Sequence, residues 1–493
     1  MGGIFVSHRV NVRILAAVSA VALWATACVK DNNTTAPVIA KDNTFVGYSD
    51  PATQQTTCGN CHVLKQETWA KTGHAKAWAN LQASGHASAS CDQCHTVSGL
   101  TNIAKDSSGY FTVAADAKKY YQDVQCESCH GPGAAHVAVP DETQPIPYLV
   151  SKDTTLNVGC GMCHSGPPHN PFYEDWSRGA HGGMVAHAVA NTNCWPCHNG
   201  KTAEARFGGS NTYVEASSSN PMPIGCTTCH NPHGSDNTNE LRESITVRDT
   251  TNLCIQCHKR EPFPDPSNKY GPHYPAGMVF LGDAGWFPPG FTWDSTNIPT
   301  HSDPSVNKTL CATCHLGQIN VNNGAGKLAW HYTGHSFWAI PCVDTAGIDS
   351  TNSCDVSQRD FSACTGSGCH ASQDAARALF ESIGQEMSYL TNTLWVDSNG
   401  NGKVDTTDGG LLAKVPPTEF AADTIITTAE GALWNVQLVT KDKSQGVHNP
   451  PFEKALLIAT IEAVQQRYGV AAPPAVQALI AREGSRLGVR IAR

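Results

Sequence analysis

The residues best placed to do chemistry are cysteines and histidines, of which the chain of 493 residues has 21 and 22. Eight times, a cysteine is followed by two residues, a second cysteine and a histidine, as in CGNCH and CATCH. Two thiols at this spacing can form thioethers to the two vinyl groups of one haem, and the histidine then lies beneath the iron. The predicted thioether cysteines are Cys58, Cys61, Cys91, Cys94, Cys126, Cys129, Cys160, Cys163, Cys194, Cys197, Cys226, Cys229, Cys254, Cys257, Cys311 and Cys314. The predicted proximal histidines are His62, His95, His130, His164, His198, His230, His258 and His315.

Two other classes of site use paired cysteines, and the pattern disfavours both. A zinc ribbon needs paired C-x-x-C units but no histidine after each one. A redox dithiol needs one such motif in a strand–helix–strand setting. Eight motifs that all end in histidine are typical of haem attachment instead. On these motifs the chain, over roughly residues 58 to 370, resembles the multihaem c-type cytochromes.

The stretch CTGSGCH, which ends at His370, has four residues between its cysteines where the other motifs have two. We interpret Cys364, Cys369 and His370 as a spacing variant that binds a ninth haem. Cys342 stands where another motif would open but lacks its second cysteine and histidine, so we expect it to form a disulfide with Cys354 in an oxidising compartment. Two alternatives stay open: Cys354 and Cys369 hold the haem while Cys342 pairs with Cys364, or no haem binds there.

Each haem iron has a second face that needs a distal ligand, and histidine is the candidate. Methionine is scarce, with six in the chain, so we expect bis-histidine irons with low reduction potentials. Apart from His8 and the proximal histidines, twelve histidines remain for nine irons. The predicted distal ligands are His74, His86, His136, His181, His187, His233, His273, His335 and His448. The reserves are His169, His301 and His331.

A second repeat indicates how the chain is organised. Trp69, Trp176 and Trp330 each precede a histidine by five residues, and each pair follows one haem motif and precedes the next. This spacing predicts trihaem units, of which the third is degenerate. The predicted units are residues 51–155, residues 156–250, and residues 251–371 with haems 7 to 9.

The spacing of the motifs bounds the fold. Seven motifs share some 200 residues, too little chain to build an apolar core around each haem, so the haems must form much of the core. We therefore predict a mostly irregular fold with short α-helices around a stacked multihaem core; the many Gly, Pro, Ser and Asn residues between motifs agree. From residue 372 to 493, helical spacing in ASQDAARALFESIGQEMSYLTNTLW and PFEKALLIATIEAVQQRYG predicts an α-helical C-terminal module.

Between those two predicted helices lies DSNGNGKVDTTD, residues 397–408. Its polar residues match the ligand positions of a calcium loop, and Gly402 stands at the sharp turn. The stretch resembles the calcium loops of dockerins, with an aspartate at the last position. We predict one calcium ion here, and an ordinary Asn/Gly turn is the alternative. The predicted calcium ligands are Asp397, Asn399, Asn401, Lys403, Asp405 and Asp408.

The N-terminus predicts export. Arg9 and Arg13 precede an apolar run that is short for a membrane span, so residues 1–27 are predicted to be a signal peptide. The residues ATA before Cys28 resemble a bacterial lipoprotein box, which predicts a lipidated Cys28 and membrane contact through that anchor; an ordinary cleavage site is the alternative. Residues 28–50 are predicted to be a polar tether.

A formal net charge of −9 argues against a nucleic-acid partner. The resemblance implies an electron carrier of the outer membrane, cell surface or extracellular space, with the periplasm as alternative. Its partners would be other redox proteins, extracellular acceptors and, in a haem filament, copies of itself. The alternative is a multihaem reductase of nitrite, hydroxylamine or a sulfur oxyanion, which keeps one iron open. All nine motifs end in histidine, whereas nitrite reductases often carry a lysine in one, so we expect no enzymatic activity.

Overall fold

The computed structural model describes residues 45–97, 109–140, 159–166, 170–209, 221–267, 271–294, 296, 298–344, 347–349, 351–421 and 423–483. The predicted signal peptide, Cys28 and most of the tether lie outside these ranges, and so does His169. Among the described residues, no helix combines the length and the apolar character needed to cross a membrane.

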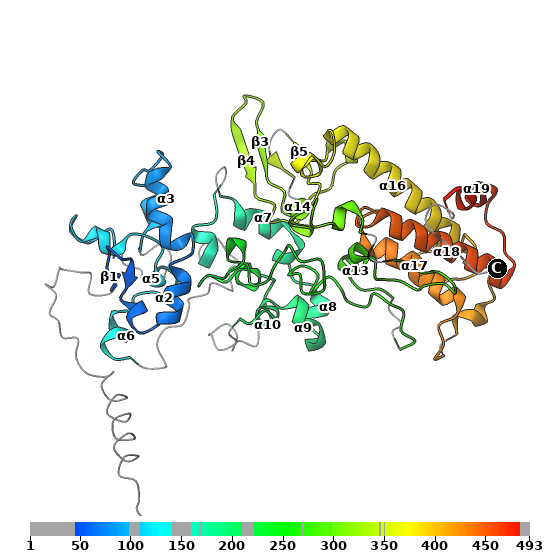
Figure 1. Ribbon diagram of the computed structural model, residues 1–493, viewed down its shortest axis with the longest axis horizontal. Helices are drawn as coiled ribbons and strands as arrows, with labels where there is room; N and C mark the ends of the chain where they lie inside the picture. Colours follow the sequence, from blue (N-terminus) through cyan, green and yellow to red (C-terminus); the bar gives the residue numbers. More distant parts are fainter. Residues whose placement is uncertain are drawn as a thin grey trace, which may run out of the picture.

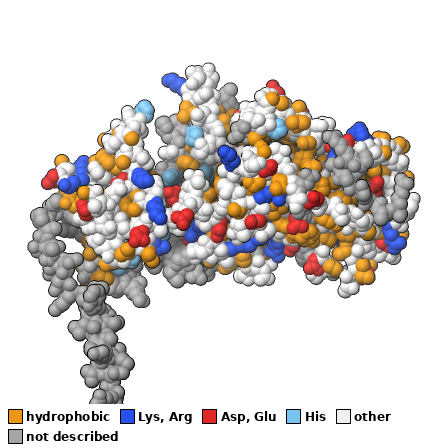
Figure 2. Space-filling model, in the orientation of Figure 1, with side chains coloured by type: hydrophobic (Ala, Val, Ile, Leu, Met, Phe, Trp, Pro, Cys, Tyr) orange, Lys and Arg blue, Asp and Glu red, His pale blue; other side chains and the backbone are white. Residues whose placement is uncertain are grey.

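The molecule is elongated, and the chain runs broadly along its long axis (Figure 1). The segment with the first three motifs lies at one end, in blue and cyan. The helices α17 (Thr428–Asp442) and α18 (Pro450–Tyr468) lie at the other end, in orange and red. On the face drawn in Figure 2, basic and acidic side chains are interspersed, so this face carries no broad field of a single sign.

The helices of the motif region are short, because most motifs are followed within a few residues by glycine, proline or another turn-forming residue; the first motif, which the helix Val63–Trp69 follows directly, is the exception. They are α2 (Val63–Trp69), α3 (Ala77–Ala83), α4 (Asp92–His95), α5 (Cys126–His130), α6 (Ala134–Ala138), α7 (Phe172–Arg178), α8 (Ala186–Val189), α9 (Trp195–His198), α10 (Gly200–Arg206), α12 (Cys226–Cys229), α13 (Ala276–Leu281), α14 (Cys311–His315) and α15 (Ser362–Thr365). The 3₁₀ turns are Cys58–Asn60, His74–Lys76, Lys118–Tyr121, Gly159–Met162, Ala180–Gly182, Thr192–Cys194, Thr238–Glu240, Thr300–Ser302, Val356–Gln358, Gly366–Gly368, Leu412–Lys414 and Pro417–Phe420.

Strands are few in the described ranges, and they pair as antiparallel two-stranded ribbons. The ribbon of β3 and β4 projects from the long side of the molecule (Figure 1) and has Val321 opposite Trp330. The strands are β1 (Tyr48–Asp50), β2 (Gln55–Thr56), β3 (Ile319–Asn322), β4 (Leu328–Tyr332), β5 (Val343–Asp344) and β6 (Gly347–Ile348).

The C-terminal region is built from longer helices: α16 (Gln373–Leu394), α17, α18 and α19 (Pro474–Glu483). Their starts carry side-chain caps. Ser372 caps α16, Thr427 forms a capping box with Glu430 at α17, and Asn449 caps α18. Gly469 then ends α18 in the left-handed conformation, with φ at 66°.

The largest apolar core lies among these helices. Helix α18 is buried on nearly every side because α16 and α17 both pack against it. A second apolar cluster joins α18, through Phe452 and Leu456, to α13 and to Ile255 in the seventh haem motif. The helical region is therefore packed onto the haem-motif region. The predicted fold class, mostly irregular with short helices and a helical C-terminal part, is confirmed.

Candidate haem sites

Helical turns give the C-x-x-C-H motifs a common local shape. The histidine N–H donates to the carbonyl of the first cysteine at 2.9 Å in three motifs, from His62 to Cys58, His164 to Cys160 and His230 to Cys226. In a helical turn, residues three and four positions apart lie on one face. Both sulfurs and the imidazole therefore face the same side, as attachment to one porphyrin requires.

Eight of the nine motif histidines face one histidine from outside the motifs. The spacing recurs closely, since the ring centres are always 6.0 to 6.4 Å apart. The pairs are His62–His136 at 6.2 Å, His74–His164 at 6.1 Å, His130–His233 at 6.0 Å, His181–His258 at 6.2 Å, His198–His273 at 6.2 Å, His230–His335 at 6.4 Å, His301–His370 at 6.2 Å and His315–His448 at 6.2 Å.

This separation fits one metal ion between two imidazoles. Two metal–nitrogen bonds of about 2 Å each, plus the distance from each bound nitrogen to its ring centre, give ring centres about 6 Å apart. The surroundings of the first pair also fit a porphyrin. Val63 and Leu64, next to His62, are 51% and 76% exposed, and Val139, near His136, is 68% exposed. The donor set and these apolar side chains suit haem.

The pairing uses seven of the nine predicted distal histidines and departs from prediction at the other two. His86 and His187 are exposed, and neither faces a motif histidine among the described residues. His301, which we held in reserve, faces His370 of the ninth motif at 6.2 Å. His331, also in reserve, bonds to the amide oxygen of Asn320 at 2.7 Å.

The second motif differs from the rest. No imidazole among the described residues faces His95 at the separation seen in the other pairs. The ring of His95 is nevertheless oriented, because its Nδ1 lies 2.9 Å from the carbonyl of Ala77. His169, the third reserve, is outside the described residues.

Two of the paired imidazoles, His181 and His258, are held in the neutral form that can bind iron. A metal-binding imidazole must be neutral, and desolvation lowers the pKa of His181 to about 4 and of His258 to about 3. A hydrogen bond from the other ring nitrogen fixes tautomer and orientation. Such a bond joins His315 to the carbonyl of Phe337 at 2.8 Å, and His230 to that of Asn239 at 2.7 Å.

Cysteines of different motifs also lie beside one another. Thiols interact between the first and third motifs, the second and fourth, the fifth and seventh, and the seventh and eighth. The interacting cysteines are Cys58 with Cys126, Cys94 with Cys163, Cys197 with Cys257, and Cys254 with Cys311. Motifs that are 57 to 69 residues apart in the sequence are therefore neighbours in space.

Aromatic rings link further pairs. Phe172 contacts both His164 and His335, with ring centres 5.7 and 4.9 Å away. Phe337 contacts both His335 and His181, at 6.2 and 4.5 Å. The imidazole pairs of the fourth, sixth and seventh motifs thus follow one another, with a phenylalanine ring between successive pairs.

The tryptophans of the Trp–His repeat brace the motifs. In the first unit, Trp69 Nε1 donates to the carbonyl of Val124 at 3.0 Å, and in the second, Trp176 Nε1 donates to that of Ile224 at 2.8 Å. Both carbonyls lie two residues before the third motif of their unit. Trp330 instead donates to the Asp175 carboxylate at 3.1 Å, so the third unit departs from the repeat.

The ninth motif has a longer loop but ends in a similar way. The backbone N–H of His370 donates to the Cys364 carbonyl at 3.2 Å, although four residues separate the two cysteines of this motif instead of two. A disulfide joins Cys342 to Cys354, with an S–S distance of 2.05 Å. This is the expected pairing; it occupies the sulfur of Cys354 and leaves the thiols of Cys364 and Cys369 free of that disulfide.

The loop of residues 397–408 folds back on itself. The Gly402 N–H donates to Asp397 at 2.8 Å, and Gly402 has φ at +71°, a conformation that favours glycine. The Asn399 and Asn401 amides both donate to Asp405 at 2.9 Å. Within the described ranges, no three His, Cys, Asp or Glu side chains group closely enough to hold a metal ion.

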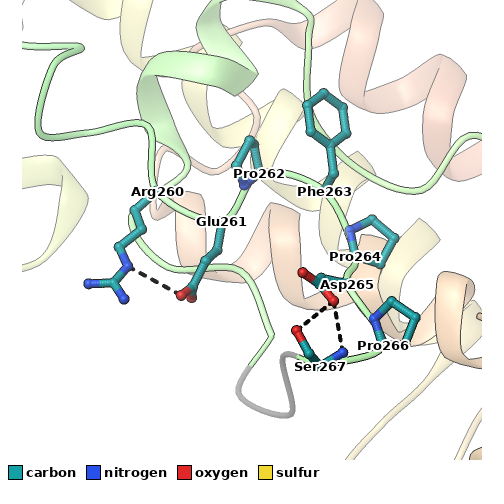
Figure 3. A pocket seen from close by; sticks show the side chains of 8 residues that line it. All are labelled: Arg260, Glu261, Pro262, Phe263, Pro264, Asp265, Pro266 and Ser267. Atoms are coloured by element: carbon teal, nitrogen blue, oxygen red, sulfur yellow. Dashed lines mark hydrogen bonds and ion pairs between the residues drawn. The ribbon is translucent and has the colours of Figure 1, made fainter. Parts of the chain in front are cut away.

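A surface hollow of about 670 Å³ lies against the loop that follows the seventh motif (Figure 3). Residues 260–267 line it, and its polar groups bond to one another: Arg260 to Glu261 at 3.2 Å and Asp265 to the Ser267 hydroxyl at 2.7 Å. One continuous loop forms the lining, so the hollow does not gather functional groups from separate elements.

Two families match parts of the chain. Residues 57–131 match the family described as cytochrome c554 and c-prime, and residues 220–263 match the doubled CXXCH motif. The multihaem cytochrome MtrA of Shewanella baltica (strain OS185) is 27% identical over 197 residues, which cover 35% of this chain and 54% of MtrA. The match thus spans about half the length of that relative.

Two solved structures are similar at a low level. The outer cell wall cytochrome OcwA has a TM-score of 0.45 and 20% identity, over 76% of each chain. The undecahaem cytochrome from the S-layer of Carboxydothermus ferrireducens has a TM-score of 0.46 and 18% identity, over 87% of this chain and 70% of its own. The assignment to a family rests on the repeated motifs and on the sequence matches. The repeated motifs and these sequence matches support the multihaem c-type cytochrome family for this chain.

Proposed function

We propose that the chain binds nine haems and carries electrons between redox partners. The observation that carries the proposal is the set of eight imidazole pairs at one recurring separation. In each pair the motif histidine would be the proximal ligand and the other histidine the distal ligand. Haem supplies a one-electron iron couple, and the protein sets its potential through axial ligands and their surroundings.

The neighbour relations support an order for the haems. Thioether cysteines lie at haem edges, so the interacting cysteines support an arrangement in which haem 1 would lie beside haem 3, haem 2 beside haem 4, haem 5 beside haem 7, and haem 7 beside haem 8. The phenylalanine contacts connect haem 4 to haem 6 and haem 6 to haem 7. Cys129 of haem 3 interacts with Cys163 of haem 4, and Cys314 of haem 8 interacts with Cys364.

These relations define what we call the haem row: haems 1, 3, 4, 6, 7, 8 and 9 in sequence, with haem 2 beside haem 4 and haem 5 beside haem 7. An electron entering at haem 1 would pass along the long axis of the molecule toward the C-terminal helices. The proposed units of residues 51–155, 156–250 and 251–371 would then be successive segments of this row.

Two features support delivery to acceptors outside the inner membrane. The predicted signal peptide provides export, and the predicted lipid on Cys28 would anchor one end of a long conductor. Other redox proteins would be the donors, and extracellular compounds the final acceptors.

Spectroscopy tests the ligand assignment. With two histidines on each iron of the eight pairs, we expect those irons to be low-spin in the oxidised protein and to bind little carbon monoxide in the reduced protein. Magnetic circular dichroism of the intact protein measures the spin states, and carbon monoxide titration counts open irons. A high-spin fraction amounting to one haem of nine would instead support the reductase alternative, which needs an open iron.

We also propose that the loop of residues 397–408 binds calcium. Hydrogen bonds, first from the Thr407 hydroxyl and then from Asn399 and Asn401, lower the pKa of Asp405, so its charge is available to a cation. We expect Asp397→Ala to weaken calcium binding roughly tenfold or more, because ligand charge sets affinity over several decades. Titration calorimetry measures the Kd.

The matched control for the calcium loop is Asp423→Ala, which removes an exposed aspartate from a different loop. It should leave the calcium Kd unchanged. If titration calorimetry of the unaltered protein detects no heat of binding at millimolar calcium, the loop is an ordinary turn.

The haem row could also continue from one copy of the chain to the next. A head-to-tail contact that does not close would make a filament. Electron microscopy of native extracellular material should then show thin filaments with one copy of the chain in each repeat, whereas uniform single particles would leave an anchored or soluble carrier.

A further inference from the structure

Asp442, the last residue of α17, makes an unusual contact with a proposed haem ligand. Its side chain is 0% exposed, and its two oxygens lie 2.8 and 3.0 Å from His448 Nδ1. The Ser444 hydroxyl donates to the same carboxylate and accepts a hydrogen bond from the backbone N–H of His448 at 3.2 Å. The imidazole that faces His315 is thus oriented by a buried carboxylate, and this is the distal ligand proposed for haem 8.

The other hydrogen bonds that the described residues show for Nδ1 of a histidine at a haem site have neutral acceptors. Five more histidines at the haem sites bond through Nδ1 to backbone carbonyls. They are His95 with Ala77, His230 with Asn239, His301 with Val447, His315 with Phe337 and His335 with Thr333. A carboxylate carries a full negative charge, and hydrogen bonds to ionised acceptors are roughly twice as strong as neutral ones.

We propose that Asp442 is a positioning residue that lowers the reduction potential of haem 8 by acting through His448. The inference rests on the ligand pairs of the proposed function. A carboxylate that accepts the Nδ1 proton makes the imidazole a stronger electron donor, and it places negative charge near the iron. Both effects favour ferric over ferrous iron. Haem 8 is then harder to reduce than it would be with a carbonyl partner.

The neighbouring acid does not supply this charge. Glu453 on α18 is 0% exposed, and its two carboxyl oxygens have no hydrogen-bond partner in the described part of the chain. Desolvation, and then the charge of Asp442, raises the pKa of Glu453 well above its usual value, so it stays neutral. From α14, the groups facing His448 are His315 and Cys311, both assigned to haem 8.

The test is the Asp442→Asn substitution in the haem-loaded protein. Spectroelectrochemical titration then measures the reduction potentials of the haems. Asparagine can still accept the Nδ1 proton through its amide oxygen, but it has no charge. We expect one haem of nine to become easier to reduce by about tenfold in its equilibrium constant, or ~59 mV for one electron, with the rest unchanged. Glu453→Gln is the matched control, because it replaces a buried neutral acid, and it should leave all nine potentials in place.

A third variant separates this inference from the proposed function. His448→Ala should convert one haem to high spin if His448 is a ligand. If every haem stays low-spin, the ligand pair itself is wrong. Suppose instead that His448→Ala gives one high-spin haem. The role given to Asp442 is then overturned if Asp442→Asn changes no reduction potential, or if Glu453→Gln changes the same potential by as much. In either case the proposed haem row is unaffected.

Discussion

Replacing His335 by alanine is expected to open one haem iron in the middle of the protein and to slow electron passage along the whole molecule. His335 faces His230 at 6.4 Å and lies between Phe172 and Phe337, so it is the distal ligand that we propose for haem 6, through which the proposed haem row would pass. Losing an axial ligand should slow end-to-end transfer at least tenfold or so, since even outer partners of metal ligands are worth 10 to 100-fold. Stopped-flow reduction and reoxidation measure the rate.

The expected spectral change is equally specific. The His335→Ala protein should gain one high-spin haem and bind one carbon monoxide per molecule when reduced. His187→Ala is the matched control, because His187 is an exposed histidine that faces no motif histidine in the described ranges. It should change neither the spectrum nor the rate. The opposite result, with His187→Ala opening an iron and His335→Ala opening none, would reverse the ligand assignment.

Removal of Cys364 is expected to cost the protein its ninth haem, while removal of Cys354 leaves nine. Cys364 and Cys369 are the sulfurs left to the ninth motif once Cys342 and Cys354 are joined. The Cys364→Ala protein should therefore lose the full attachment of one haem. Intact mass of the mature protein, with absorbance of the reduced haem, counts the haems.

The Cys354→Ala protein should instead lose stability. The two cysteines of the disulfide are separated by 12 positions in the sequence. A disulfide that closes a loop of this size typically contributes about 3 kcal/mol to the free energy of unfolding. Denaturant unfolding measures this loss. Cys342→Ala is the matched control and should lose the same stability and keep nine haems. Loss of a haem from Cys354→Ala, with nine kept in Cys364→Ala, would favour the long-spaced motif instead.

The motif cysteines and histidines could be found from the sequence because their chemistry is local. Two cysteines and a histidine within five residues lie on one helical turn, as in α5 and α14, whatever surrounds them. The C-terminal helices were predictable for a similar reason. The spacing of apolar residues and the capping residues Thr427 and Asn449 lie within or directly beside a single helix, so they predict that helix without knowledge of its surroundings.

The distal histidines were harder to predict because their partners lie far away in the chain. His130 and His233 are 103 residues apart, and His230 and His335 are 105 apart. His86 and His187 were predicted to be distal ligands, yet both are exposed and face no motif histidine in the described residues. His301 belongs to no repeat, so nothing in its surroundings marked it out.

By itself, therefore, the sequence determined the kind of cofactor, the residues that attach it and the helical character of the C-terminal region, because each depends on residues a few positions apart. Only the tertiary structure decided which histidine faces which, which motifs are neighbours, and that a buried carboxylate, Asp442, contacts His448. The contacts between histidines and between motifs join segments separated by tens to more than a hundred residues, whereas Asp442 and His448 are six residues apart and meet across the turn between α17 and α18. His315 meets His448 when α13, α14, α17 and α18 pack together, and no local pattern records that packing.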